Sequence, residues 1–119
     1  MIVSKGEKVH VIMRRFFDEA VRRHFVGEIK EADGAIVRLE GYVFIHDPAT
    51  IQYVRKPEQR VTVVDLADSG YVVNFIPVDI DLAKLSYKYI AQPSERKKTL
   101  VVTDGDSFSL DINEFGLSR

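Results

Sequence analysis

Short runs in which apolar and polar residues alternate occupy most of the chain, and turn-forming residues separate them. Three longer runs, at residues 35–46, 60–66 and 71–76, are rich in Val, Ile, Tyr and Phe, and shorter ones fall at 25–29 and 85–90. β-Branched and aromatic residues favour strands, and a period of two is typical of a strand with one buried face. The sequence therefore predicts a mainly β protein with at most one or two short helices.

Turn signals divide these runs. Asp33-Gly34 and Asp104-Gly105 are Asp-Gly pairs, which strongly favour hairpins because both residues tolerate a positive φ. Gly41 interrupts the run 35–46 and predicts a bulge or a sharp bend. An Asp at position 79 or 81 is placed to cap one helical turn within residues 79–85. Short strands joined by tight turns favour a small barrel or a sandwich.

Two interpretations fit the first quarter of the chain. Apolar residues recur at helical spacing over residues 9–25, and Ser4-x-x-Glu7 fits a capping box ahead of them. The alternative is a strand at residues 8–15, a turn, and a second strand from residue 22. Periodicity alone does not decide between a helix and a hairpin here.

The spacing over residues 6–45 resembles the first sequence motif of Sm-like proteins. The Gly that opens the motif and the alternating Val residues after it are matched by Gly6, Val9 and Val11. Its aromatic residue, Gly, aliphatic residue, Asp and closing aliphatic pair are matched, in that order, by Phe25, Gly27, Ile29, Asp33, Ile36 and Leu39. The resemblance favours the hairpin over the helix. It implies a small, strongly bent barrel of Sm-like or SH3-like form that assembles into homo-oligomeric rings through strand edges.

Two features depart from the family pattern. Val37 stands where the family has an Asn that helps to hold a base, and the Arg-Gly step of the second motif has no match near residues 71–74. The resemblance therefore implies the fold and the ring, and it does not imply uridine recognition. We expect a single domain over residues 1–119, with a barrel core at 6–91 and an added C-terminal hairpin at 99–112.

Composition and charge narrow the function classes. The 119 residues are 45% hydrophobic and 29% charged, which excludes a disordered chain and a coiled coil. Seventeen basic and eighteen acidic residues give a net charge of −1, so the chain as a whole is not a polyanion binder. The absence of Cys excludes disulfides and thiolate metal sites. No apolar stretch approaches the ~20 residues that cross a bilayer, and we expect a cytoplasmic protein without a membrane partner.

A basic cluster near the N-terminus is the main candidate site. It consists of Arg14, Arg15, Arg22, Arg23 and His24. Residues 1–30 hold seven basic and four acidic residues, a net charge of +3, and Phe16, Phe17 and Phe25 lie beside the cluster. Arginines with neighbouring aromatic rings suit single-stranded nucleic acid, RNA in particular, with no expected specificity for DNA. The competing interpretation is that Asp18 and Glu19 neutralise two of the arginines and that the Phe residues belong to the core.

Catalytic and metal-binding signatures are missing from the sequence. His10, His24 and His46 lack the spacing of metal ligands, and turn formation or helix capping accounts for the paired aspartates. Nucleophile, phosphate-loop and dinucleotide motifs do not occur. We therefore expect a non-enzymatic binding scaffold that forms a homo-oligomer and needs no cofactor or metal. An RNA-binding protein and a small metal-dependent enzyme are the two alternatives.

Overall fold

The computed structural model describes residues 2–91 and 98–112, and the chain divides into two compact units, Met1–Asp79 and Ile80–Arg119. The strands of the first unit are β1 (Lys8–Ile12), β2 (Arg23–Asp33), β3 (Ile36–Asp47), β4 (Gln52–Arg55), β5 (Arg60–Asp65) and β6 (Val72–Ile76). The elements of the second unit are a 3-10 helix η1 (Leu82–Lys84), β7 (Ser86–Ala91), β8 (Lys98–Thr103) and β9 (Ser109–Asp111). The predicted mainly β class, with at most one or two short helices, is confirmed.

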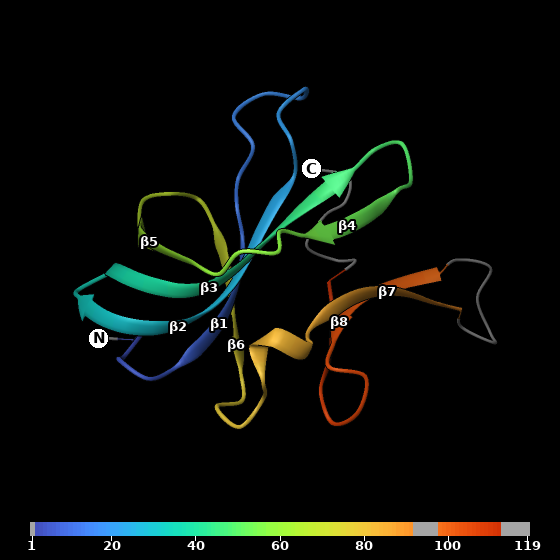
Figure 1. Cartoon of the computed structure of the whole chain (residues 1–119). Helices are drawn as coiled ribbons and strands as arrows, with labels where there is room; N and C mark the ends of the chain where they lie inside the picture. Colours follow the sequence, from blue (N-terminus) through green and yellow to red (C-terminus); the bar gives the residue numbers. More distant parts are fainter. Residues whose placement is uncertain (1, 92–97, 113–119) are drawn as a thin grey trace. The chain divides into compact units, whose positions relative to one another are not determined.

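One antiparallel sheet forms the first unit, in the order β4-β3-β2-β1-β6, and β5 also pairs with β3 (Figure 1). The first half of β3, from Ile36 to Gly41, pairs with β5, and its last residues, from Phe44 to Asp47, pair with β4. β3 thus holds two partners in succession along the same edge. Figure 1 shows that β2 and β3 curve together through this region.

Gly41 lies at a close approach of the β2 and β3 backbones, directly opposite Gly27 in the register. A Cβ atom at Gly41 would lie 2.6 Å from the Cα atom of Gly27 and closer still to the carbonyl oxygen of Val26. No side chain fits in that space, so glycine is required for this approach. The predicted bend thus has a specific cause, although the register shift lies in β2, between Ile29 and Glu31.

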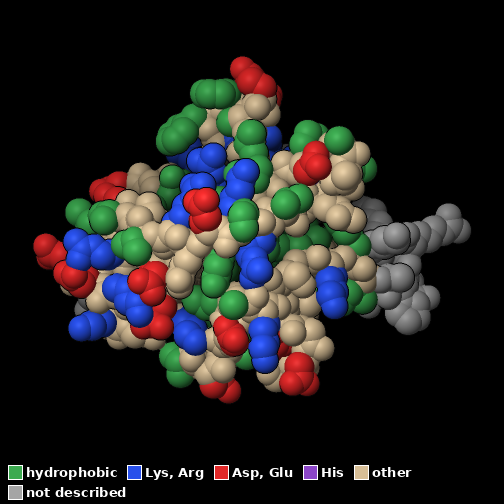
Figure 2. All heavy atoms as spheres, in the orientation of Figure 1, with side chains coloured by type: hydrophobic (Ala, Val, Ile, Leu, Met, Phe, Trp, Pro, Cys, Tyr) green, Lys and Arg blue, Asp and Glu red, His purple; other side chains and the backbone are tan. Residues whose placement is uncertain are grey.

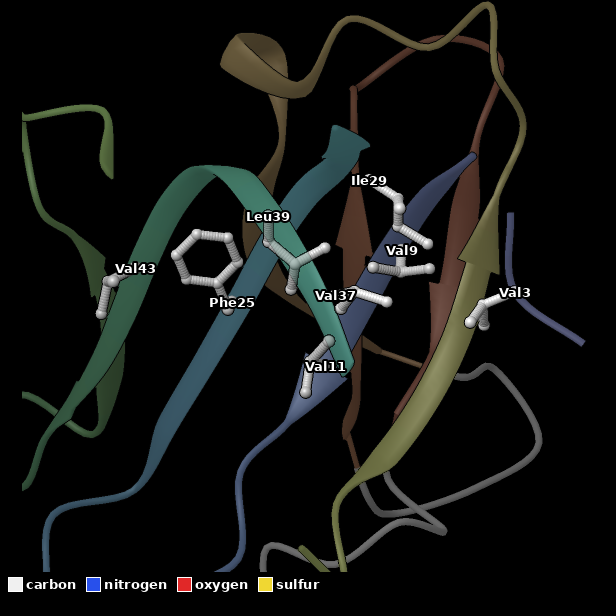
Figure 3. Close-up of a cluster of buried hydrophobic side chains, with 8 residues drawn as sticks. All are labelled: Val3, Val9, Val11, Phe25, Ile29, Val37, Leu39 and Val43. Carbon is white, nitrogen blue, oxygen red and sulfur yellow. The ribbon is translucent and has the colours of Figure 1, made fainter. Parts of the chain in front are cut away.

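A cluster of buried aliphatic and aromatic side chains fills the concave side of the bent sheet (Figure 3). It comprises Val3, Val9, Val11, Phe25, Ile29, Val37, Leu39 and Val43. Within each strand these residues are spaced by two or four positions, which puts them on one face of the sheet. The burial of each such side chain stabilises the folded state by about 1.5–3 kcal/mol relative to its exposure to water. The core therefore depends on β1, β2 and β3 together.

Residues 8–25 form a hairpin, and the helical interpretation of this segment is wrong. Val9, His10 and Val11 alternate between the two faces of β1: the two valines enter the core, and the histidine lies on the opposite face. Ser4 and Glu7 do interact as in a capping box: the Ser4 N–H donates to Glu7 Oε1 at 2.5 Å. The bond closes a turn ahead of β1 and does not begin a helix.

Aspartate side chains organise the turns that the sequence predicts. Gly34 and Ala35 form a two-residue loop between β2 and β3, and Gly34 has a φ of +59°, which glycine adopts without strain. Asp81 caps η1 by accepting a hydrogen bond from the Ala83 N–H at 3.0 Å. The Asp104 carboxylate accepts from three backbone N–H groups, at residues 106, 107 and 108, and these bonds lower its pKa. The second predicted hairpin is therefore present with a longer loop.

The second unit is a three-stranded sheet in the order β7-β8-β9. β7 pairs with β8 from Ser86 opposite Thr103 to Ala91 opposite Lys98. The expected barrel core at residues 6–91 includes the residues of β7, whereas the hydrogen-bonding partner of β7 is β8 of the C-terminal hairpin. The Pro77 break and the 3-10 turn separate β7 from β6, so the chain begins a new sheet there.

Gly41→Ala tests the close approach of the two strands. We expect it to lower the free energy of unfolding by at least about 3 kcal/mol, because the backbone of β2 must move away to admit a methyl group. Gly34→Asn is the matched control, since asparagine tolerates a left-handed φ and the space there is open, and it costs no more than about 1 kcal/mol. Urea denaturation measures both variants, and equal losses would contradict the role given to Gly41.

Candidate nucleic-acid interface

A loop of residues 13–22 joins β1 to β2 and carries most of the predicted basic cluster; we call it the β1–β2 loop (Figure 1). Its base is closed by a hydrogen bond from the Met13 N–H to the Arg23 carbonyl oxygen at 3.1 Å. Its tip holds a turn in which the Ala20 N–H donates to the Phe17 carbonyl oxygen at 3.0 Å. Met13 also packs against the core cluster, so the base of the loop is anchored to the sheet.

The aromatic residues at the tip of the loop are exposed. Phe16 is 77% accessible and Phe17 is 61% accessible, whereas Phe25 is buried in the core. The competing interpretation, in which all three are core residues, is therefore wrong for the two loop residues. Figure 2 shows hydrophobic and acidic side chains at this tip, with Lys and Arg side chains directly below them. Exposed rings beside cations are suited to contacts with planar ligands.

The arginines of the loop form no ion pairs with the described residues. Among the described residues, the salt bridges within 4.0 Å are Lys30–Glu28, Lys30–Glu40 and Arg38–Glu31, all on β2 and β3. Arg15 instead donates from Nη1 to the backbone oxygen of Asp18 at 2.9 Å. The Arg14 guanidinium lies 5.8 Å from the centre of the Phe16 ring, a cation–π contact. The positive charge of the loop thus stays available to a ligand.

A cavity of about 430 Å³ opens against the inner side of the loop; we call it the loop cavity. Its cationic and aromatic lining residues are Arg14, Arg15, Arg23, Phe16, Phe17 and Tyr71, and Glu19 contributes one carboxylate. Arg15 Nε is buried and has no hydrogen-bond partner among the described residues. A buried donor left unpaired costs about 1–3 kcal/mol, more when it is charged. The Arg15 side chain therefore carries one buried donor without an acceptor among the described residues.

The structure separates the five residues of the predicted cluster. Arg14, Arg15 and Arg23 line the loop cavity, whereas Arg22 does not. His24 is 5% accessible, because neighbouring residues of a strand face opposite sides and Arg23 takes the exposed side. His46 lies close enough to Arg22 and Arg15 for their charges to lower its pKa, after a larger effect of burial. Tyr71 and His46 are thus the residues near the loop that the sequence did not indicate.

Three histidines and a tyrosine form a contiguous row of rings across β1 to β4. His10 meets His24 edge to face with ring centres 5.3 Å apart, and His24 stacks on Tyr53 at 4.6 Å. His46 contacts the other side of Tyr53 at 5.1 Å. The Asn74 amide, opposite His10 in the register, lies 3.3 Å from His10 Nδ1 and can donate to it, which leaves the ring proton on Nε2. The row is a packing element of the sheet.

Burial keeps the two inner histidines neutral. It lowers the pKa of His10 from 6.5 to about 4. It also lowers the pKa of His24 to about 3, and repulsion by His10 when protonated, by Arg22, and by His46 when protonated adds to the effect. Within the described residues, no group of three His, Cys, Asp or Glu side chains is arranged to hold a metal ion.

No protein-family model, curated protein or solved structure matches the chain. The resemblance to Sm-like proteins over residues 6–45 accordingly stays a prediction. The helical segment of the described residues, η1, is three residues long, and none of the helices there has the length and apolar character to span a membrane.

Acid should destabilise the fold through the inner histidines. A histidine with a lowered folded-state pKa stabilises the fold fully above its unfolded pKa of about 6.5, and this contribution is lost as the pH falls toward the folded value. We expect the titration of each of His10 and His24 to lower the free energy of unfolding by about 2 kcal/mol between about pH 7.5 and about pH 5.

Urea denaturation at the two pH values measures this loss. His10→Gln should reduce the pH dependence of the free energy of unfolding by roughly half, because glutamine does not titrate and can still accept a hydrogen bond from Asn74. His46→Gln, at a half-buried position, should leave most of it in place. A pH dependence that is unchanged in His10→Gln would show that the buried ring is not its source.

Proposed function

We propose that this chain is a non-enzymatic binding scaffold that assembles with copies of itself through strand edges. The observation that supports the proposal is the set of open strand edges of the first sheet. Among the described strands, β4 and β5 each pair with β3 alone, and β6 pairs with β1 alone. An open edge presents unpaired N–H and C=O groups, which in most folds are covered, charged or paired with another strand.

The β5 edge carries exposed apolar side chains. Val61 is 59% accessible and Val63 is 60% accessible, and they share one face of the strand because Thr62 lies between them. Ile36, on the partner strand β3, is 51% accessible. A monomer rarely exposes an apolar strip along an unpaired strand. Burial of this strip against a second copy removes both the apolar surface and the open edge.

The β6 edge differs from the β5 edge because an apolar groove of about 250 Å³ lies beside it. Val73 and Phe75 of β6 line the groove together with Ile2, Val3 and Leu66. Pairing of β5 in one copy with β6 in the next joins two different surfaces. Such head-to-tail contacts repeat until a ring closes. This is the assembly that the resemblance to Sm-like proteins also implies.

Light scattering after size exclusion tests the assembly. The chain weighs 13.6 kDa. A ring of about five to seven copies would weigh about 70–95 kDa. We expect Val61→Lys combined with Val63→Lys to give a folded monomer, because buried charges along the edge oppose pairing. Val78→Lys, at a position 65% accessible and outside the strands, should retain the wild-type mass. A monomeric wild-type protein would refute the proposal.

A second candidate function is binding of single-stranded nucleic acid, either RNA or DNA, by the β1–β2 loop. It is favoured by the exposed Phe16 and Phe17 beside arginines that have no carboxylate partner within the described residues. Arginines neutralise phosphates, and each stacked base contributes about 1–3 kcal/mol whatever its identity. This arrangement does not distinguish RNA from DNA, since the 2′-hydroxyl plays no part in it.

Fluorescence anisotropy with a labelled single-stranded RNA measures this function. We expect affinity to fall steeply with salt. Phe16→Ala combined with Phe17→Ala should weaken binding at least about tenfold, because both side chains are exposed and stability is little affected. Arg38→Ala is the control, since Arg38 pairs with Glu31 on the sheet and lies outside the loop. Absence of binding at ~50 mM salt would exclude this candidate.

The metal-dependent enzyme receives no support from the described residues. Asp81 caps η1 and Asp104 organises the β8–β9 turn, so these carboxylates already have structural roles. A non-catalytic role and a cytoplasmic location remain part of the proposal.

A further inference from the structure

We propose that one end of the first unit docks on the surface of an anionic lipid bilayer. Two connections lie at this end: the β1–β2 loop, and the turn of residues 48–51 between β3 and β4, which we call the β3–β4 turn. The docking is peripheral and needs no segment that crosses the bilayer, so it differs from the expectation of a protein without a membrane partner. It goes beyond both functions proposed above and depends on neither.

The two connections leave the first sheet at the same end (Figure 1). In the register of β2 and β3, Arg23 lies opposite Ile45, so the start of β2 adjoins the end of β3. The His46 N–H donates to the Arg22 carbonyl oxygen at 3.0 Å and extends this pairing to the base of the β1–β2 loop. The β3–β4 turn begins one residue after His46 and Asp47 end β3. The loop and the turn are therefore neighbours.

Exposed apolar side chains gather on these two connections. Besides Phe16 and Phe17, Val21 of the loop is 54% accessible and Ile51 of the turn is 63% accessible. Val21 and Ile51 are aliphatic and do not stack on nucleobases as aromatic rings do, whereas the acyl boundary of a bilayer accommodates both kinds of side chain. The composition of this end of the sheet therefore favours a bilayer over a nucleic acid.

Ile51 adopts a left-handed backbone conformation, with a φ of +58°. This conformation is strained for a β-branched residue, because its Cβ atom crowds the backbone, and Gly or Asn adopts it more readily. The Ile51 N–H donates to the Asp47 carbonyl oxygen at 2.8 Å, so the turn fixes the conformation. Because the side chain is mostly exposed, packing within the chain does not offset the strain. Contact with an apolar phase outside the chain accounts for an isoleucine at this position.

The cations lie behind the apolar tip. Residues 13–23 hold four arginines and two carboxylates, a net charge of +2. Figure 2 shows Lys and Arg side chains directly below the hydrophobic side chains of the tip. A bilayer surface has the matching order, because apolar side chains enter the boundary of the acyl chains while basic side chains meet the anionic headgroups. Asp18 and Glu19 oppose such a surface, so we expect a modest affinity that falls with salt.

Tryptophan fluorescence tests the docking, because the chain contains no Trp. The probe is a vesicle of phosphatidylcholine and phosphatidylserine in equal amounts. We expect the emission of Phe17→Trp to shift to shorter wavelength on addition of these vesicles and to be quenched by brominated acyl chains, since the ring enters the acyl boundary. Emission that is the same with and without the vesicles would overturn the proposal.

Val78→Trp is the matched control for the reporter. Val78 is 65% accessible and follows β6, whose last residue, Ile76, pairs with Lys8 at the end of β1 remote from the β1–β2 loop. Its emission should not change when vesicles are added. An equal shift in both reporters would show that the protein does not dock by the proposed end, and would overturn the proposal.

Ile51→Asn separates the strain from the docking. Asparagine tolerates a left-handed φ, so the variant should unfold at a higher urea concentration than the wild type. Its binding to the same vesicles, measured by sedimentation, should weaken about threefold or more, because an apolar side chain is lost from the tip. Val78→Asn makes a similar change at the remote end and should bind as the wild type does. Wild-type binding by Ile51→Asn would overturn docking by the two connections.

The charge requirement is tested with Arg14→Gln combined with Arg23→Gln. We expect binding to the anionic vesicles to weaken about fivefold for each basic side chain removed. Arg38→Gln is the control, since Arg38 pairs with Glu31 on the sheet and lies outside the loop. Equal binding of the wild type to vesicles of phosphatidylcholine alone would overturn the assignment of an anionic surface.

The RNA anisotropy assay separates the docking from the second candidate function. If the wild type binds the vesicles and not the RNA, the docking is supported and the nucleic-acid candidate fails. If it binds the RNA and not the vesicles, the docking is overturned and that candidate stands. If it binds neither ligand, both fail, and light scattering still decides the self-assembly.

Discussion

The backbones of β2 and β3 approach each other at Gly27 and Gly41 more closely than any side chain at Gly41 allows, and the rest of the first unit depends on that approach. It lets β3 curve, so that β3 pairs with β5 along its first half and with β4 along its last residues. The same curvature brings the apolar residues of β1, β2 and β3 onto one concave face, where they form the core. A flat sheet would spread these side chains apart.

The curved sheet also explains where functional groups are found. Its concave face is taken up by the core, and the opposite face holds the row of histidines and Tyr53, in which His10, His24 and Tyr53 are buried and the first two are neutral. The polar side chains that are available to a ligand therefore lie at the ends of the strands. The β1–β2 loop, anchored by Met13 in the core and closed by the bond to Arg23, holds three arginines around a cavity. The open edges β5 and β6 supply the other available surfaces. The proposed binding at the loop and the proposed assembly at the edges would use different parts of the first unit.

The strands and turns follow local signals closely. Alternation and β-branched residues predicted β3, β5 and β6 to within a few residues, and the Asp-Gly pairs and Asp81 marked turns and a cap that are present. Local signals did not decide the first quarter, where helical and strand patterns overlap. There the burial of Val9 and Val11 against β2 and β3 selects the strand, and this gain exists only in the folded sheet. Local signals also did not predict the pairing of β7 with β8, because it depends on which strands are adjacent in the folded chain after Pro77 ends β6.

The sequence by itself determined the mainly β class and the positions of most turns, because these depend on neighbours close in the chain. Only the tertiary structure decided which of the cluster's members face solvent. Strand alternation and packing bury His24, and the β5–β6 turn brings Tyr71 to the cavity from nearly fifty positions away. The burial of Arg15 Nε is also a tertiary result, since it depends on how neighbouring residues pack around the guanidinium. Contacts of this kind join segments that share no local pattern, so neither hydrophobic periodicity nor a sequence motif predicts them.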